Sequence, residues 1–275
     1  MLCFLPVPSF AQQRPLRTEG ADTVPAGTMR VMVGFDFLQD SDFPLSGLSG
    51  DLTSVGVLDV RTGVGKMVEL QMQGTVQHFL DVKRQVGSFV TPTLTGSAST
   101  HDVGDFAAFV KVRFLGEGKR RPGVAVRFGY LLPTSDQSRG IGSNTQDIFV
   151  DIILQKHFAK LLLMGNVGIG ILQAPAALFT QNDVLRYGAA FSYPVHRRVN
   201  IVGEVAGFQS TRTITSGLLG TESRGEARLG MQVQAAGFLW DVAGIAGLTR
   251  NSPRTGFTFG VSKDLRIFDY SSVKP

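Results

Sequence analysis

The feature that constrains this chain most is a two-residue alternation of apolar and polar side chains across residues 123–158. The alternation runs over two arms joined by the polar, glycine-bearing link 135–144. Successive side chains of a β-strand point to opposite faces, so this period predicts a hairpin of two strands, each with one apolar face. In a soluble sheet that face packs on a core, whereas in a membrane barrel it contacts lipid and the polar face encloses a lumen. The rest of the chain decides between these two arrangements.

The same alternation recurs along the chain and predicts about twelve strands, most of about 10 to 13 residues. A tilted strand needs 9–11 residues to cross a bilayer, whereas strands of soluble proteins usually have five or six. Long and short connections alternate. The expected long connections include 38–50, 81–103 and 135–144, and the short ones include 63–65 and Ala159. Outer-membrane barrels sort their connections in this way, with long outer loops and short periplasmic turns.

The composition suits strands that face lipid. Charged residues make up 18% of the 275 residues, below the roughly 25% usual for soluble domains, and the mean hydropathy is +0.11. No apolar run approaches the roughly 20 residues of a membrane-spanning helix. The net charge of +5 comes from basic residues scattered singly along the chain, which argues against a nucleic-acid interface. The one cysteine, Cys3, excludes an internal disulfide.

The charged side chains fall on the faces opposite the apolar ones. The residues predicted to line the lumen and a possible solute path are Glu69, Lys111, Arg113, Arg127, Asp147, Asp151, Arg186, Glu204, Glu226 and Arg228. On lipid, a basic residue near the midplane would cost about 2–4 kcal/mol. Inside a barrel these groups can pair across strands, for example Arg113 or Arg127 with Asp147 or Asp151. Two interpretations stay open: a structural network that partly plugs the lumen, and a selectivity filter for a solute.

A soluble barrel of the lipocalin type is the alternative fold, with the polar set facing water. The polar face of each strand is thin and rich in glycine, which favours the membrane barrel. Catalysis has little support, because the four histidines fall near strand ends or in links and no HExxH, CxxC or phosphate loop occurs. We therefore expect no enzyme, no cofactor and no metal site. An outer-membrane acyl hydrolase with an embedded serine–histidine pair is the remaining catalytic alternative.

The first residues resemble the end of a secretory signal. Residues 1–10 are apolar, and Ser9-Phe10-Ala11 is a small-x-small cleavage site before Gln12. No lysine or arginine precedes this stretch, which we explain by a true start that lies upstream. The alternative is an apolar N-terminal arm of a cytoplasmic protein. Residues 12–26 are polar, and we expect them to form a loose periplasmic lead-in.

Residues 127–154, RFGYLLPTSDQSRGIGSNTQDIFVDIIL, show a distinctive order of features. A strand ends in the Leu-Pro-Thr step 132–134, a glycine-bearing loop at 140–143 follows, and Asp147 opens the next alternating strand. This order resembles the family of transporter-like outer-membrane proteins named for the MetA-pathway of phenol degradation. The resemblance covers about 124–170. It implies an outer-membrane barrel that passes small hydrophobic or aromatic compounds, and it implies no catalytic residues.

These observations predict an all-β protein, a single antiparallel up-and-down transmembrane β-barrel of about twelve strands. We expect residues 1–11 to be a signal-peptide remnant, 12–26 the periplasmic lead-in and 27–275 the barrel, in a Gram-negative-type outer membrane with both termini periplasmic. The expected partners are outer-membrane lipid, a small-molecule solute and the barrel-assembly machinery, without nucleic acid. The expected function is passive diffusion of small, hydrophobic or aromatic solutes, and the alternative is a structural or adhesive barrel with a plugged lumen. The last strand either runs on to Phe268 or Tyr270, or the assembly signal is internal.

Overall fold

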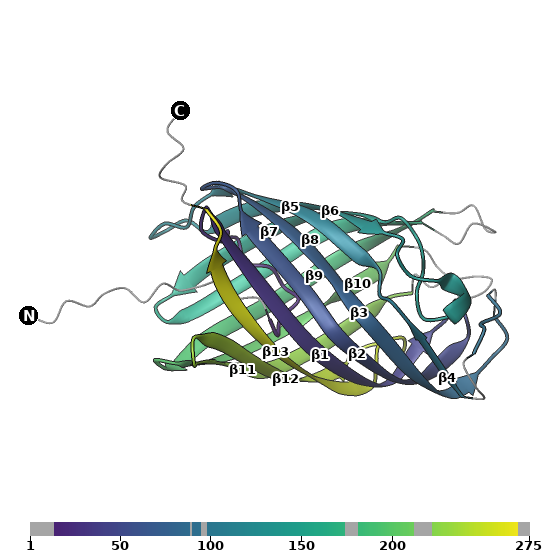
Figure 1. Cartoon of the computed structure of the whole chain (residues 1–275). Coiled ribbons are helices and arrows are strands. Elements are labelled where there is room, and N and C mark those ends of the chain that lie inside the picture. The colour runs from purple at the N-terminus through teal and green to yellow at the C-terminus, as the bar shows by residue number, and fades with distance from the viewer. Residues whose placement is uncertain (1–13, 89, 95–97, 174–180, 212–221, 269–275) are drawn as a thin grey trace, which may run out of the picture.

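The computed structural model describes residues 14–88, 90–94, 98–173, 181–211 and 222–268, so the predicted signal remnant and Tyr270 lie outside the described residues. The described chain forms a closed antiparallel barrel of twelve strands, which confirms the predicted fold (Figure 1). No helix in this part of the chain is long and apolar enough to cross a bilayer. The elements are β1 (Thr28–Phe43), β2 (Leu48–Gly63), β3 (Val68–Gln85), β4 (Ser99–Asp102), β5 (Phe106–Leu115), β6 (Gly123–Leu132), η1 (Gln137–Arg139), β7 (Ile148–Phe158), β8 (Leu161–Gln173), β9 (Gln181–His196), β10 (Val199–Ser210), β11 (Arg224–Ala235), β12 (Phe238–Gly247) and β13 (Thr255–Arg266).

The wall is an up-and-down meander in which neighbours in sequence pair with one another. It closes where β1 pairs with β13, with Val33 opposite Val261. One edge of β3 pairs with β2, and the other edge pairs with β5 and then, further along, with β4. The short β4 therefore extends the wall beyond β5 and adds no separate strand to the circumference. The last strand ends at Arg266, and the amide of Ile267 still donates to the Gly27 carbonyl at 2.9 Å.

The two faces of the strands differ sharply in exposure. Phe114, Leu229 and Ile169 point outward and keep 67%, 64% and 57% of their surface exposed, whereas inward Lys111 and Glu69 keep 2% and 0%. Large apolar side chains that are exposed around the whole circumference of a closed barrel are stable only in contact with lipid. The chain is therefore an outer-membrane barrel with an apolar outer surface and a polar lumen.

The two rims differ in the length of their connections. The turns 64–67, 159–160, 197–198 and 236–237 lie at the rim where the described chain begins and ends, which we call the periplasmic rim. β4 and η1 lie at the opposite, outer rim (Figure 1). Long outer loops and short periplasmic turns give this orientation.

Two predicted long connections contain strands, and in the one expected at 81–103 β3 continues to Gln85 and β4 forms at Ser99–Asp102. The long link expected at 38–50 is mostly strand, because β1 continues to Phe43 and β2 begins at Leu48. The pairing register shifts between Leu38 and Ser41, and again between Gly34 and Phe35. Such a bulge adds a residue to one strand and breaks the two-residue period, which hides the strand in the sequence.

Apolar side chains also point inward at the outer rim. Leu38, Leu48, Leu52, Leu80 and Ile245 form a buried cluster there. Ile141 of the loop that follows η1 and Leu94 of the loop before β4 pack against this cluster. The two loops are therefore held against the inside of the barrel mouth.

Candidate functional site in the barrel lumen

Residues 14–26, which we call the plug, lie inside the barrel and not in a loose lead-in. Arg14, Leu16, Thr18, Glu19 and Ala21 are all buried. The plug is anchored to strands on different sides of the wall. Its hydrogen bonds include Arg14 Nη2 to Thr258 Oγ1 of β13 (2.8 Å), Thr18 Oγ1 to Glu204 Oε2 of β10 (2.7 Å), Glu19 N to Asn166 Oδ1 of β8 (2.6 Å), Ala21 N to Gln155 Oε1 of β7 (2.9 Å) and Val24 N to Glu69 Oε2 of β3 (2.5 Å). A segment bound to so much of the circumference crosses the bore.

Glu19 is the centre of the first ionic network between plug and wall. Its two carboxylate oxygens accept hydrogen bonds from both terminal nitrogens of Arg61 at 2.9 and 3.0 Å. Lys111 Nζ lies 3.3 Å from the same carboxylate, and Arg127 lies 3.7 Å from it. Burial alone would raise the pKa of Glu19, but the charges of Arg61, Arg127 and Lys111 outweigh burial and lower the pKa well below its usual range. Glu19 therefore stays ionised in the lumen.

The second network gathers the main chain of the plug around Glu204 of β10. The carboxylate accepts hydrogen bonds from the Arg17 amide at 2.7 Å and from the Thr18 amide at 2.8 Å. Arg228 of β11 lies 3.7 Å from Glu204 and donates to the Pro15 carbonyl at 2.9 Å. Backbone N–H groups that donate to no helix or sheet carbonyl thereby donate to a charged acceptor.

The plug also fills apolar and glycine-lined spaces. Leu16 joins an inward cluster of wall residues that includes Leu162 and Val202. Burial of one leucine side chain contributes about 1.5–3 kcal/mol. At Gly34 of β1 and Gly260 of β13, an added Cβ would collide with the Arg14 guanidinium. The glycines on the inner face therefore leave the room that the plug occupies.

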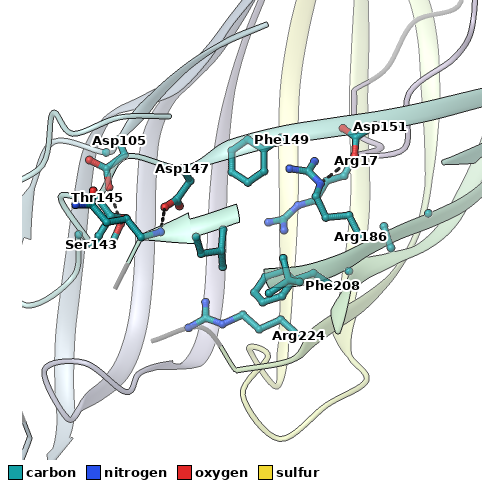
Figure 2. Close-up of a pocket in the computed structure, with 18 of the residues that line it drawn as sticks. Arg17, Asp105, Ser143, Thr145, Asp147, Phe149, Asp151, Arg186, Phe208 and Arg224 are labelled. Carbon is teal, nitrogen blue, oxygen red and sulfur yellow. Dashed lines mark hydrogen bonds and ion pairs between the residues drawn. The ribbon is translucent and has the colours of Figure 1, made fainter. Parts of the chain in front are cut away.

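On the outer side of the plug lies a cavity of about 510 Å³, which we call the outer cavity. Its floor includes Arg17 and Thr18 of the plug, and its mouth includes Ile141 and Ser143 of the loop after η1. Phe149 of β7 and Phe208 of β10 border the space between floor and mouth (Figure 2). A volume in this range suits a small-molecule ligand.

The ten residues predicted to line the lumen all project inward or lie at a rim of the bore. Glu69, Lys111, Arg127, Asp147, Asp151, Glu204, Glu226 and Arg228 are buried, whereas the side chains of Arg113 and Arg186 are 29% and 27% exposed. Of the expected pairs, Arg127 lies 3.9 Å from Asp151. Asp151 is closer to Arg186, at 3.1 Å. Arg113 instead pairs with Asp22 of the plug at 3.1 Å. Asp147 accepts a hydrogen bond from the Gln173 amide at 2.9 Å.

The plug residues that complete these networks were not predicted from the sequence. A signal existed in the strand register, because Lys111 of β5 stands directly opposite Arg127 of β6. Like charges opposite one another destabilise a sheet unless an anion lies between them. Glu69 of β3 and Asp151 of β7 stand opposite these two cations on their other sides, and Glu19 of the plug adds a third carboxylate within 3.3 Å of Lys111 and 3.7 Å of Arg127.

One serine–histidine contact lies in the lumen. Ser54 Oγ of β2 is 2.8 Å from His78 Nδ1 of β3. Within the described residues, no carboxylate makes a hydrogen bond to the other ring nitrogen, so the pair lacks the acid that orients a catalytic histidine. The same part of the chain contains no group of three histidine, cysteine or acidic side chains placed to hold a metal ion.

No protein-family model and no curated protein sequence matches this chain. Solved structures share its fold. The COG4313 outer membrane channel from Pseudomonas putida F1 superposes with a TM-score of 0.63 at 13% identity, over 90% of this chain and 98% of that chain. The translocator domain of the autotransporter NalP from Neisseria meningitidis gives a TM-score of 0.51 at 11% identity, over 86% and 88%. At these identities the likeness shows the architecture of an outer-membrane barrel.

The expectation that the chain is not an enzyme was wrong as a conclusion, because barrels with the same general architecture include enzymes. LpxR from Salmonella typhimurium has a TM-score of 0.44 at 6% identity over 86% of this chain and 99% of that chain. A likeness this distant says nothing about the activity of this chain. The architecture therefore does not exclude catalysis.

Proposed function

We propose that this barrel is a channel that passes small, hydrophobic or aromatic solutes across the outer membrane by passive diffusion. The observation that carries the proposal is the outer cavity, which opens between loops at the outer rim and ends on the plug. Phe149 and Phe208 give it apolar walls. The plug is held by hydrogen bonds, ion pairs and packing, and it belongs to no strand of the wall. Displacement of the plug would connect the outer cavity to the periplasmic rim without breaking the barrel.

Two further observations support this proposal. The barrel from Pseudomonas putida F1 that shares this fold is described as an outer membrane channel. The sequence of residues 127–154 also resembles the family named for the MetA-pathway of phenol degradation, which implies small hydrophobic or aromatic compounds as the solutes.

The second candidate function is a structural barrel whose lumen stays plugged. The ionic networks of Glu19 and Glu204 favour it, because they pair the inward charges and hold the plug on several strands. The two candidates differ in one respect. In a channel the plug is displaced during passage, whereas in a structural barrel its removal changes stability alone.

Liposome swelling tests the proposal. The full chain and a variant that lacks residues 14–24 are reconstituted and supplied with phenylalanine, alanine or arabinose. We expect faster swelling with the variant than with the full chain, and faster entry of phenylalanine than of alanine. If neither protein admits any of the three solutes, although both show the heat-dependent gel shift of a folded barrel, the channel proposal fails and the structural barrel stands.

A further inference from the structure

Three arginines from separate elements line the outer cavity near the plug. Arg17 comes from the plug, Arg186 from β9 and Arg224 from β11, and we call them the arginine floor (Figure 2). The Arg17 side chain keeps 56% of its surface exposed and lies 3.5 Å from Glu226. Arg186 pairs with Asp151 at 3.1 Å, and Arg224 donates to the Asp42 carbonyl at 2.9 Å. Each guanidinium is thus fixed on one side by the protein while it lines the cavity.

The acidic residues of the outer cavity lie mostly away from this floor. Asp105 and Asp147 gather with Ser143 and Thr145 at one end of the cavity (Figure 2). Asp105 accepts hydrogen bonds from the Thr134 amide at 3.1 Å and the Ser135 amide at 2.9 Å. The loop at the mouth therefore uses these carboxylates for its own structure. Near the floor, Asp151 is the lining carboxylate, and it faces the Arg186 side chain.

A second cavity of about 550 Å³ adjoins the first and shares the arginine floor. Its lining adds Asp36, Asp59 and Glu226. The second cavity therefore has the larger share of carboxylates, whereas the lining of the outer cavity has four arginines, the arginine floor and Arg127, against three aspartates. An anion gains most from the outer cavity, because it enters a partly desolvated space with an excess of positive charge.

The same floor is bordered by aromatic rings. The Arg186 guanidinium lies 4.4 Å from the centroid of the Phe149 ring, within the distance of a cation–π contact. Phe208 lies between Arg186 and Arg224 in the view of Figure 2. Guanidinium groups bind carboxylates through two parallel hydrogen bonds, and aromatic rings bind flat apolar bodies.

From this arrangement we propose that the outer cavity is a binding site for small organic monocarboxylates with an aromatic body. The carboxylate would accept hydrogen bonds from Arg17, Arg186 and Arg224, and the aromatic body would lie against Phe149 and Phe208. The proposal rests on the proposed channel function for its biological role and names the class of solute. The site itself is defined by equilibrium binding and does not require transport.

Isothermal titration of the full chain in detergent micelles tests the site with three probes of similar shape: benzoate, the neutral benzamide and the cationic benzylamine. Titrations into empty micelles give the blank. We expect saturable binding of benzoate that is about tenfold tighter than that of benzamide, because hydrogen bonds between charged groups are stronger than those of a neutral amide. Benzylamine should bind more weakly than benzamide. Equal affinities for the three probes, or no binding of benzoate, would overturn the proposal.

Arg224→Gln should weaken benzoate binding about tenfold and leave benzamide binding unchanged. Arg254→Gln is the matched control, because Arg254 lies at the outer rim, is 69% exposed and pairs with Asp40 at 3.1 Å. If Arg224→Gln does not fold, Arg186→Gln and Arg224→Lys replace it, and the lysine variant should lose less affinity than the glutamine variant. Equal losses in Arg224→Gln and Arg254→Gln would overturn the site. If liposomes swell but titration shows no preference for benzoate over benzamide, the binding site is refuted and the channel is not. If titration shows the preference for benzoate but no liposomes swell, the channel is refuted and the binding site is not.

Discussion

Replacement of Glu19 by glutamine removes one buried negative charge from the plug and keeps the shape of the side chain. In the docked state Arg61, Lys111 and Arg127 all lie within 3.7 Å of the Glu19 carboxylate, and the carboxylate is 1% exposed. Loss of one partner from a buried ion pair costs about 3–5 kcal/mol. Glu69 remains 3.0 Å from Lys111 and continues to neutralise part of the network. The cost should therefore lie at the lower end, about 3 kcal/mol.

This cost falls on the docked state, because water solvates the three cations once the plug has left the lumen. A change of 1.4 kcal/mol is tenfold in an equilibrium constant, so the ratio of undocked to docked plug should rise roughly 100-fold. Single-channel recording in planar bilayers measures this ratio as the frequency of open events. The heat-dependent gel shift of the barrel shows whether the wall is still folded.

The matched control is Asp22→Asn, because Asp22 belongs to the same plug and has one ion pair, to Arg113 at 3.1 Å. Its side chain is 35% exposed, and exposed pairs contribute about 0–1 kcal/mol. Asp22→Asn should therefore raise the open frequency less than about fivefold. If Glu19→Gln also stays below fivefold while the wall is folded, the Glu19 network does not hold the plug in the lumen.

Three other predictions follow from the wall and the plug. Gly188→Ala places a Cβ at 2.7 Å from Thr18 Oγ1, whereas the Cβ of Gly165→Ala meets nothing within 4 Å. Gly188→Ala should destabilise the docked plug by about 1–2 kcal/mol and so raise the open frequency by roughly 5- to 30-fold. Gly165→Ala should leave the open frequency unchanged. Leu229→Arg, at an outward position in the middle of β11, should lower the free energy of unfolding in urea by about 2–4 kcal/mol. Val195→Arg, near the periplasmic end of β9, should lower it by only about 0–1 kcal/mol. Equal losses for the two variants would contradict the lipid-facing assignment. Burial acts to raise the pKa of Glu117 in the turn before β6, but hydrogen bonds from His157 and Lys156 outweigh it and lower the pKa to about 2. A depressed pKa stabilises the fold at pH values above the usual pKa of 4.5, and this stability is lost as the pH falls through about 2. The Tm difference between the native chain and Glu117→Gln should therefore be full near about pH 6 and vanish at about pH 2. A Tm difference that does not change with pH would refute this role of Glu117.

The fold was readable from the sequence because lipid contact and strand geometry act on the same alternation. In β5 the outward Phe114 and the inward Lys111 occupy opposite faces, as the period of two requires. Where the alternation fails, at the bulge of β1 near Leu38, the prediction of a long connection also failed. Leu38 itself still points inward and packs in the apolar cluster at the rim, and the extra residue of β1 lies between Leu38 and Ser41.

The inward charges were also readable, since an inward position on a barrel strand follows from its neighbours. The ion-pair partners of these charges were harder to predict. Asp151 was expected to pair with Arg113 or Arg127, but Arg186 of β9 lies closest at 3.1 Å. β7 and β9 are separated by β8, so this pair crosses two strand spacings, and long side chains such as arginine reach across them. Periodicity predicts which face of the strand a residue occupies, whereas its ion-pair partner depends on the three-dimensional structure.

The plug was hidden for a further physical reason. Much of its anchorage comes from main-chain amides, those of Arg17 and Thr18 to Glu204, of Ala21 to Gln155 and of Val24 to Glu69. Every residue except proline carries such an amide, so these bonds leave no trace in the choice of side chain. The trace lies on the wall instead, in inward acids and in glycines such as Gly188 that leave room for a second chain segment. A barrel whose inner face combines many charged side chains with glycines that leave space beside them should therefore be expected to hold a polar segment of its own chain, even where that segment shows no periodic pattern.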